Sequence, residues 1–138
     1  MDYAGFWKRA AAAIIDCIIS VIGGAIIGIA FSILMVTNSN SNLETIQTWS
    51  NVIGIIIGWL YFTVMESSPL QGTLGKMTLG IKVTDLHGHR ISFSRATARH
   101  FAKILSTLLF LVGYLMAAFT KKKQALHDML ASCLVVNR

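Results

Sequence analysis

The chain has 138 residues, of which 54% are hydrophobic and only 13% are charged, and its formal net charge is +6. About a quarter of the residues in a soluble domain are charged, so this composition excludes an ordinary soluble protein and indicates a membrane protein. The basic residues follow the boundaries of apolar runs and belong to no soluble recognition domain, which argues against a nucleic-acid-binding role.

The first apolar run covers residues 10–36. It is about 40 Å long as a helix, against a hydrocarbon core of about 30 Å, and it is too long for a signal peptide. We therefore predict a retained, tilted membrane helix that begins on the cytoplasmic side. Asp16 interrupts this run. A carboxylate at that depth costs about 2.5 to 3.5 kcal/mol, so it should face the protein interior.

The second apolar run covers residues 49–65, near the lower limit for a membrane span. Trp49 lies at one end and Trp59 and Tyr61 toward the other, as interfacial aromatic residues do. The stretch between the two runs, 37–48, has no lysine or arginine, which predicts an outer loop. Each run contains two glycines four positions apart, a spacing that lets helices pack closely but that is also common by chance. These glycines are Gly24 and Gly28 in the first run and Gly54 and Gly58 in the second.

Residues 66–93 form a polar middle region. Within it, Leu79–Phe93 alternates apolar and polar side chains around a His-Gly turn, which predicts a small cytoplasmic β-hairpin. The C-terminal segment, 120–138, contains the β-branched stretch SCLVVN, which adds a third strand if the C-terminus is cytoplasmic.

Residues 94–119 begin as a basic amphipathic helix and continue into a third apolar segment, 101–119. Three straight crossings would place the last basic residues outside, against the positive-inside tendency. We therefore predict a segment that enters and returns, breaking near Gly113, with a cytoplasmic C-terminus; a straight third span is the alternative. Three basic residues four positions apart form a stripe predicted to face anionic lipid of the inner leaflet: Arg95, Arg99 and Lys103.

Several apparent motifs lack essential parts. The stretch GTLGKMT has neither the hydroxyl residue after the lysine nor the first glycine of a phosphate-binding loop. The pair His127-Asp128 has no nucleophile in a recognisable turn, so we expect no enzymatic activity. Cys17 and Cys133 are far apart and lack histidines at ligand spacing, so we expect no disulfide framework, metal or cofactor.

Three stretches resemble the RDD family of small bacterial membrane proteins: YAGFWKRAAAAIID, MESSPLQGTLGKMTLGIKVTDLHGHRISFSRATARH and KKKQALHDMLASCLVV. The resemblance covers nearly everything except the outer loop. It implies a single all-α membrane domain over residues 1–138 in the bacterial inner membrane. The arginine and two aspartates that name the family match Arg9, Asp16 and Asp128. Most members have no assigned function, and cation/proton antiport has been proposed for some.

The polar residues yield specific hypotheses. Arg9 points toward the cytoplasmic interface, away from Asp16, so we predict a structural or gating ion pair between Arg9 and Asp128. Asp16 then needs a partner or a water-filled cleft, or becomes neutral. We predict Asp16 as a proton- or cation-coupling site and Glu66 as its entry group, with two residues in support: Lys76 and His127.

Two functions remain as hypotheses. The first is a proton-coupled transporter of a small cation or solute, and a homo-oligomer, because one copy provides few walls for a pathway. The second is a non-transporting accessory protein whose basic cytoplasmic face binds lipid or a protein partner. The alternative to the coupling-site hypothesis is that the buried charged residues only lock helix packing and topology.

Overall fold

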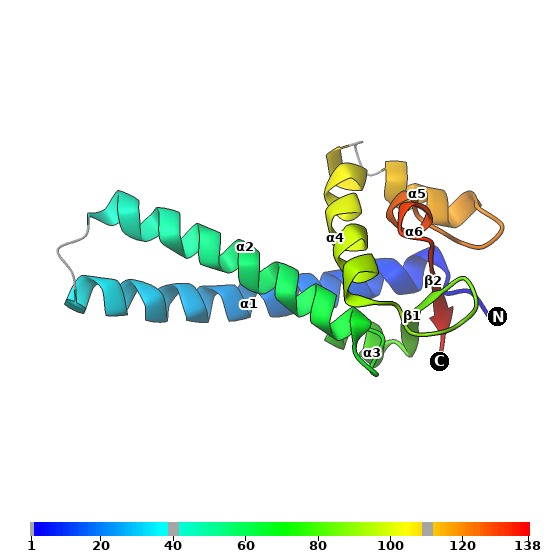
Figure 1. The fold of residues 1–138 in the computed structure, drawn as a ribbon, viewed down its shortest axis with the longest axis horizontal. Helices are drawn as coiled ribbons and strands as arrows, with labels where there is room; N and C mark the ends of the chain where they lie inside the picture. Colours follow the sequence, from blue (N-terminus) through cyan, green and yellow to red (C-terminus); the bar gives the residue numbers. More distant parts are fainter. Residues whose placement is uncertain (1, 39–41, 109–111) are drawn as a thin grey trace.

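A long pair of helices, with a small domain at one end, makes up the protein in this computed structural model (Figure 1). The structure describes residues 2–38, 42–108 and 112–138. The pair consists of α1 (Phe6–Asn38) and α2 (Leu43–Ser67). Both predicted long helices are confirmed, and both extend beyond their apolar runs.

The predicted outer loop is wrong for most of its length, because helix continues through much of it. α1 ends at Asn38 and α2 already begins at Leu43. Asn42 explains the early start of α2, since its side-chain oxygen accepts a hydrogen bond from the Thr45 N–H at 2.8 Å. This N-cap satisfies a backbone donor that has no partner within the helix.

Both long helices have the length and composition to cross a membrane. None of the most apolar stretch of α1, and 6% of that of α2, is buried within the protein. A core helix of a soluble domain would be largely buried, whereas lipid accounts for apolar residues exposed on all sides. Among the described residues, these two helices are the candidate membrane spans.

The small domain surrounds the first third of α1 and the end of α2 (Figure 1). Its buried apolar core includes Ala12 of α1, Ile81, Ile91, Ala96 and Val135. The domain contains four short helices and two strands: α3 (Leu74–Thr78), β1 (Ile81–Asp85), α4 (Phe93–Leu108), α5 (Val112–Phe119), α6 (Leu126–Leu130) and β2 (Cys133–Asn137).

The two strands form a small antiparallel sheet, but they are not the two strands of a hairpin. β1 pairs with the C-terminal β2, with Ile81 opposite Asn137 and Asp85 opposite Cys133. The predicted second hairpin strand is wrong. The turn does form, because the Asp85 carboxylate accepts the N–H groups of His87 and His89, both at 2.8 Å. The chain then enters α4 instead of pairing back along β1.

Both termini lie at the same end of the molecule (Figure 1). The Asn137 N–H donates to the Asp2 carbonyl at 2.9 Å, and the Ala4 N–H donates to the Val135 carbonyl at 2.9 Å. The N-terminal residues therefore run alongside β2. This pairing joins the first residues of the chain to the last.

The third apolar segment forms two helices, α4 and α5, and Figure 1 shows α5 running back beside α4. Gly113, the predicted breakpoint, lies within α5. Residues 109–111, which separate the two helices, lie outside the described residues. α5 packs against α4, α6 and α1.

Candidate functional site

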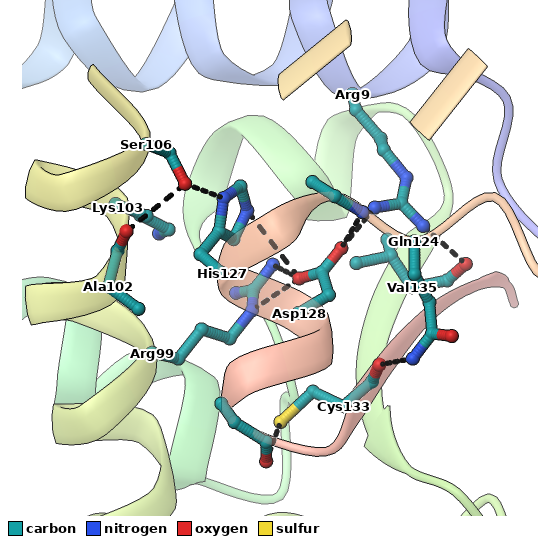
Figure 2. A network of polar contacts seen from close by, with 12 residues as sticks. Arg9, Arg99, Ala102, Lys103, Ser106, Gln124, His127, Asp128, Cys133 and Val135 are labelled. Atoms are coloured by element: carbon teal, nitrogen blue, oxygen red, sulfur yellow. Dashed lines mark hydrogen bonds and ion pairs between the residues drawn. The ribbon is translucent and has the colours of Figure 1, made fainter. Parts of the chain in front are cut away.

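A buried network of charged side chains joins α1, α2, α3, α4 and α6, and Figure 2 shows its α4 and α6 side. Arg99 of α4 is its centre. One guanidinium nitrogen, Nη1, donates to Glu66 Oε2 at 2.6 Å, while Nε and Nη2 donate to Asp128 Oδ1 at 2.8 and 2.7 Å. Arg99 and Glu66 are each 2% exposed and Asp128 is fully buried. Arg99 therefore neutralises carboxylates from two different helices.

Asp128 also binds Arg9, as the sequence predicts. Arg9 Nη1 donates to Asp128 Oδ2, and Arg9 Nε donates to the Ala4 carbonyl at 3.1 Å. Asp128 Oδ2 additionally accepts the Ala125 N–H at 3.2 Å, which caps α6. The geometry of the predicted Arg9 and Asp128 pair is confirmed. It ties the start of α1 to the C-terminal segment.

Glu66 lies among three cations. Besides Arg99, it accepts hydrogen bonds from Lys76 Nζ and from Lys103 Nζ, the latter at 3.3 Å. Burial lowers the pKa of Lys76, and the Glu66 carboxylate opposes this shift. Glu66 is thus fully engaged in ion pairs, an arrangement that differs from that of an accessible entry group.

The predicted basic stripe does lie on one face of α4, but most of it faces inward. Arg95 is exposed, whereas Arg99 is buried and Lys103 is held against Glu66. The prediction that all three residues face lipid is therefore wrong for Arg99 and Lys103. The physical reason is the charge on α2: Glu66 requires cationic partners, and α4 packs against α2.

Asp16 is 2% exposed, and its hydrogen bonds come from α2 and the start of α3. The Gly75 N–H donates to Asp16 Oδ1 at 2.8 Å, and the Thr73 hydroxyl donates to Oδ2. The Tyr61 hydroxyl lies 3.3 Å from Oδ1 and accepts the Leu74 N–H at 3.2 Å. The predicted interior-facing orientation of Asp16 is confirmed.

The polar contacts described for Lys76 and His127, the predicted supports of Asp16, go to other residues, although the Asp16 charge also acts on Lys76. Lys76 binds Glu66. His127 Nε2 lies 3.5 Å from Asp128 Oδ1, and Nδ1 lies 3.4 Å from the Ser106 hydroxyl (Figure 2). Burial lowers the pKa of His127 to about 3. Burial alone would raise the pKa of Asp128, but Arg99, His127 and Arg9 together hold it well below its usual value.

These shifts predict acid lability that begins with His127. Its folded pKa lies below its unfolded value of 6.5, so the unfolded chain binds the extra proton as the pH falls below that value. At pH 5 this effect lowers the free energy of unfolding by about 2 kcal/mol, since each pH unit below 6.5 contributes about 1.4 kcal/mol. Protonation of Asp128 in the unfolded chain lowers the free energy of unfolding further, but only below about pH 4.

The measurement is thermal unfolding in detergent at pH 7 and pH 5. We expect His127→Gln to reduce the difference between the two midpoints, because glutamine binds no proton in this range. Burial also lowers the pKa of His100, so His100 destabilises the fold at acidic pH as well. Some difference between the two midpoints should therefore remain in His127→Gln. The matched control is His89→Gln at a side chain that is 80% exposed. Equal pH dependence in wild type and His127→Gln would contradict this assignment.

A cavity of about 450 Å³ lies beside the charged network. Arg9, Lys76, Arg99 and Lys103 line one part of its wall, together with Asp16. The remaining wall is mostly apolar: Phe6, Ala10, Ala13, Cys17, Phe62, Ala117, Ala125 and Val135, with Ser20, His100 and His127. The volume falls in the range of sites for small organic ligands. Within the described residues, no cluster of three or more potential ligating side chains is arranged to hold a metal ion.

The four glycines predicted for helix packing do not bring the described helices into close contact. A Cβ built on Gly24, Gly28, Gly54 or Gly58 has no other side chain or neighbouring backbone within 4 Å. All four instead line a second cavity of about 250 Å³ between α1 and α2. Packing within the chain therefore does not account for them.

Sequence reasoning missed four partners in this site: Arg99 as the bridge, and Tyr61, Thr73 and Gly75 as the donors to Asp16. The stretch that contains Thr73 and Gly75 lacks essential parts of a phosphate-binding loop. A hydroxyl residue followed by the free N–H groups of a short helix is also a good acceptor site for a carboxylate from the same chain. That signal was present in the sequence.

Comparison with known proteins gives a consistent family assignment. The RDD family profile matches residues 3–132. The chain is 44% identical to the uncharacterized protein YxaI of Bacillus subtilis over 62% of its own length and 56% of that protein. It is 30% identical to the uncharacterized membrane protein YteJ of the same organism, over 98% of its own length and 81% of that protein.

A more distant similarity connects the chain to a mycobacterial protein. The chain is 26% identical to the proline-rich antigen homolog of Mycobacterium tuberculosis, over 98% of its own length and 63% of that protein. No solved structure matches. Because the family profile covers nearly the whole sequence and the two membrane helices agree with it, the chain is a membrane protein that belongs to the RDD family.

Proposed function

We propose that this protein is a non-transporting accessory protein of the bacterial inner membrane, which binds an anionic lipid headgroup in the cavity beside Arg99. Both termini are cytoplasmic in this proposal. The observation that carries it is the surplus of positive charge in the buried network that borders the cavity.

The distribution of charge supports this orientation. The two termini share one end of the molecule, and the segments that hold the twelve lysines and arginines all belong to that end (Figure 1). The sequence between the two apolar runs, residues 37–48, contains no lysine or arginine. Short segments rich in lysine and arginine stay on the cytoplasmic side of bacterial membranes. The small domain would then lie at the inner leaflet, where anionic lipids attract basic segments.

The balance of charges favours an anion as ligand over a cation. Among the described residues, the network contains four cations and three carboxylates: Arg9, Lys76, Arg99 and Lys103, with Asp16, Glu66 and Asp128. His127 is neutral at physiological pH because of its low pKa. A surplus charge in a largely buried network is unfavourable until a counterion compensates it, so this network stabilises a bound anion.

The remaining walls of the cavity favour an amphiphile. Side chains such as Ala13, Cys17 and Phe62 belong to the membrane helices α1 and α2 and face the same space as the cations. A ligand that satisfies both parts has a negative head and an apolar body. A phospholipid of the inner leaflet has this chemistry, and its headgroup lies at the depth of the small domain.

The test is thermal unfolding of delipidated protein in detergent with added dioleoyl phosphatidylglycerol or dioleoyl phosphatidylcholine. We expect the anionic lipid to raise the unfolding midpoint more than the zwitterionic one, because a ligand that binds only the folded state stabilises it. Lys103→Met removes the surplus charge and should abolish this preference. The matched control is Lys122→Met, at an exposed side chain in the loop before α6. Equal effects of the two lipids on the wild type would refute the proposal.

Proton-coupled cation transport is the second candidate function. The observation that favours it is Asp16, a buried carboxylate in a membrane helix that lines the cavity. In the present arrangement, however, Asp16 accepts bonds from three donors and Glu66 contacts three cations. A transported cation would have to displace these partners, so the geometry gives this candidate less support.

A further inference from the structure

The second cavity lies along the membrane part of the molecule, between α1 and α2. Its wall on α1 extends from Ile19 to Phe31, about 18 Å along the helix at about 1.5 Å per residue. One leaflet of a bilayer provides about 15 Å of hydrocarbon, half of the core thickness of about 30 Å. The groove therefore has the length of one lipid chain in one leaflet.

The glycines of this groove create space that no part of the described chain fills. A Cβ on Gly24, Gly28, Gly54 or Gly58 would meet no neighbouring atom within 4 Å. Glycine costs about 1 kcal/mol relative to alanine in a helix interior, so larger residues would give more stable helices here. Because these positions hold glycine and not larger residues, the groove stays open along both helices.

The groove adjoins the cationic cavity. Ser20 lines both cavities. Tyr61 lines the groove and Asp16 lines the cationic cavity, and the Tyr61 hydroxyl lies 3.3 Å from Asp16 Oδ1. Positive charge thus lies at one end of an apolar channel, and the two parts together match the polarity of a single anionic lipid.

We infer that the groove between α1 and α2 holds one acyl chain of the anionic lipid whose headgroup binds at the cationic cavity. This inference rests on the proposed function and names its ligand as a long-chain lipid, rather than a free anion such as inorganic phosphate. A helix of a second copy would use the apolar groove but not the charged end. Because the apolar groove and the cationic cavity adjoin each other, a lipid fits them better than a helix does.

The test compares Gly24→Leu and Gly28→Leu with wild type. Both glycines line the groove, and a Cβ at either position meets no neighbouring atom within 4 Å, so each leucine starts from open space. We expect either variant to weaken binding of dioleoyl phosphatidylglycerol on the order of tenfold, the equivalent of about 1.4 kcal/mol. Binding of dihexanoyl phosphatidylglycerol, whose chains are too short to fill the groove, should be nearly unchanged. Ala25→Leu, at an exposed position that lines neither cavity, is the matched control.

The possible outcomes separate this inference from the proposed function. If neither phosphatidylglycerol binds the wild type better than its phosphatidylcholine counterpart, the proposed function fails. If the long-chain lipid binds selectively but both groove variants bind it like wild type, the proposed function stands and the acyl-chain assignment fails. A change from dimer to monomer in the groove variants, with lipid binding unchanged, would instead assign the groove to a second copy. Inorganic phosphate that competes fully with the long-chain lipid and binds as tightly would identify a free anion as the ligand.

Discussion

Replacing Arg99 by methionine is expected to lower the free energy of unfolding by about 3 to 5 kcal/mol, the usual cost of removing one partner from a buried ion pair. Arg99 contacts both Glu66 and Asp128, so the change leaves two buried carboxylates with fewer donors. Lys76 and Lys103 remain near Glu66, and Arg9 remains near Asp128. These residual partners keep the loss within that range.

Thermal unfolding in detergent measures the effect, and we expect the midpoint to fall by about 10 °C or more. The matched control is Arg95→Met, one helical turn earlier on α4, where the side chain is exposed and the expected change is small. Combining Arg99→Met with Asp128→Asn should cost less than the sum of the two single changes, because they disrupt one interaction. Equal midpoints for Arg99→Met and Arg95→Met would contradict the central role of Arg99.

A second large effect is expected at Gly75, where α3 packs directly against α1. A Cβ at this position would lie 2.3 Å from the Ala12 carbonyl oxygen and 2.9 Å from the Asp16 carboxyl carbon. The Ala12 atom belongs to a helix backbone, so it has no rotamer through which to move away. Gly75→Ala must therefore push α3 from α1, which breaks the Gly75 N–H bond to Asp16. Overpacking costs about 1 to 3 kcal/mol, and losing a hydrogen bond to a charged group adds about 1.5 to 3 kcal/mol.

Gly5→Ala provides the control for Gly75→Ala, because a Cβ on Gly5 meets nothing within 4 Å. We expect Gly75→Ala to unfold at a clearly lower temperature than wild type, and to be cleaved by protease more readily between α2 and β1. Gly5→Ala should resemble wild type in both assays. If Gly75→Ala also resembles wild type, the close contact of α3 with α1 does not exist in the folded protein.

Features that depend on local sequence were predicted well. The long apolar runs determine α1 and α2, and the alternating pattern of residues 81–85 determines β1. The Arg9 and Asp128 pair was also predicted, since a helical arginine near the interface points toward the cytoplasmic end, where the C-terminal segment would return. In these cases, helix geometry and the positions of charges restricted the alternatives strongly.

Apart from the Arg9 and Asp128 pair, features that depend on packing between distant segments were mostly not predicted. The spacing of Arg95, Arg99 and Lys103 shows that they share a helix face, but it does not show which way that face points. The direction follows from Glu66 on α2, which attracts Arg99 and Lys103 inward. The partner of β1 depends in the same way on the C-terminal strand, since alternation identifies a strand but not its neighbour.

We propose that Asp16 joins α1 to α3 in a lipid-binding protein that moves no ions. The most direct test is pH-jump flux of sodium, potassium and protons in proteoliposomes that contain equal amounts of wild type or Asp16→Asn. We predict that neither protein produces flux above that of protein-free vesicles. Flux that increases with the amount of wild-type protein and disappears in Asp16→Asn would contradict this claim and identify Asp16 as the coupling site of a transporter.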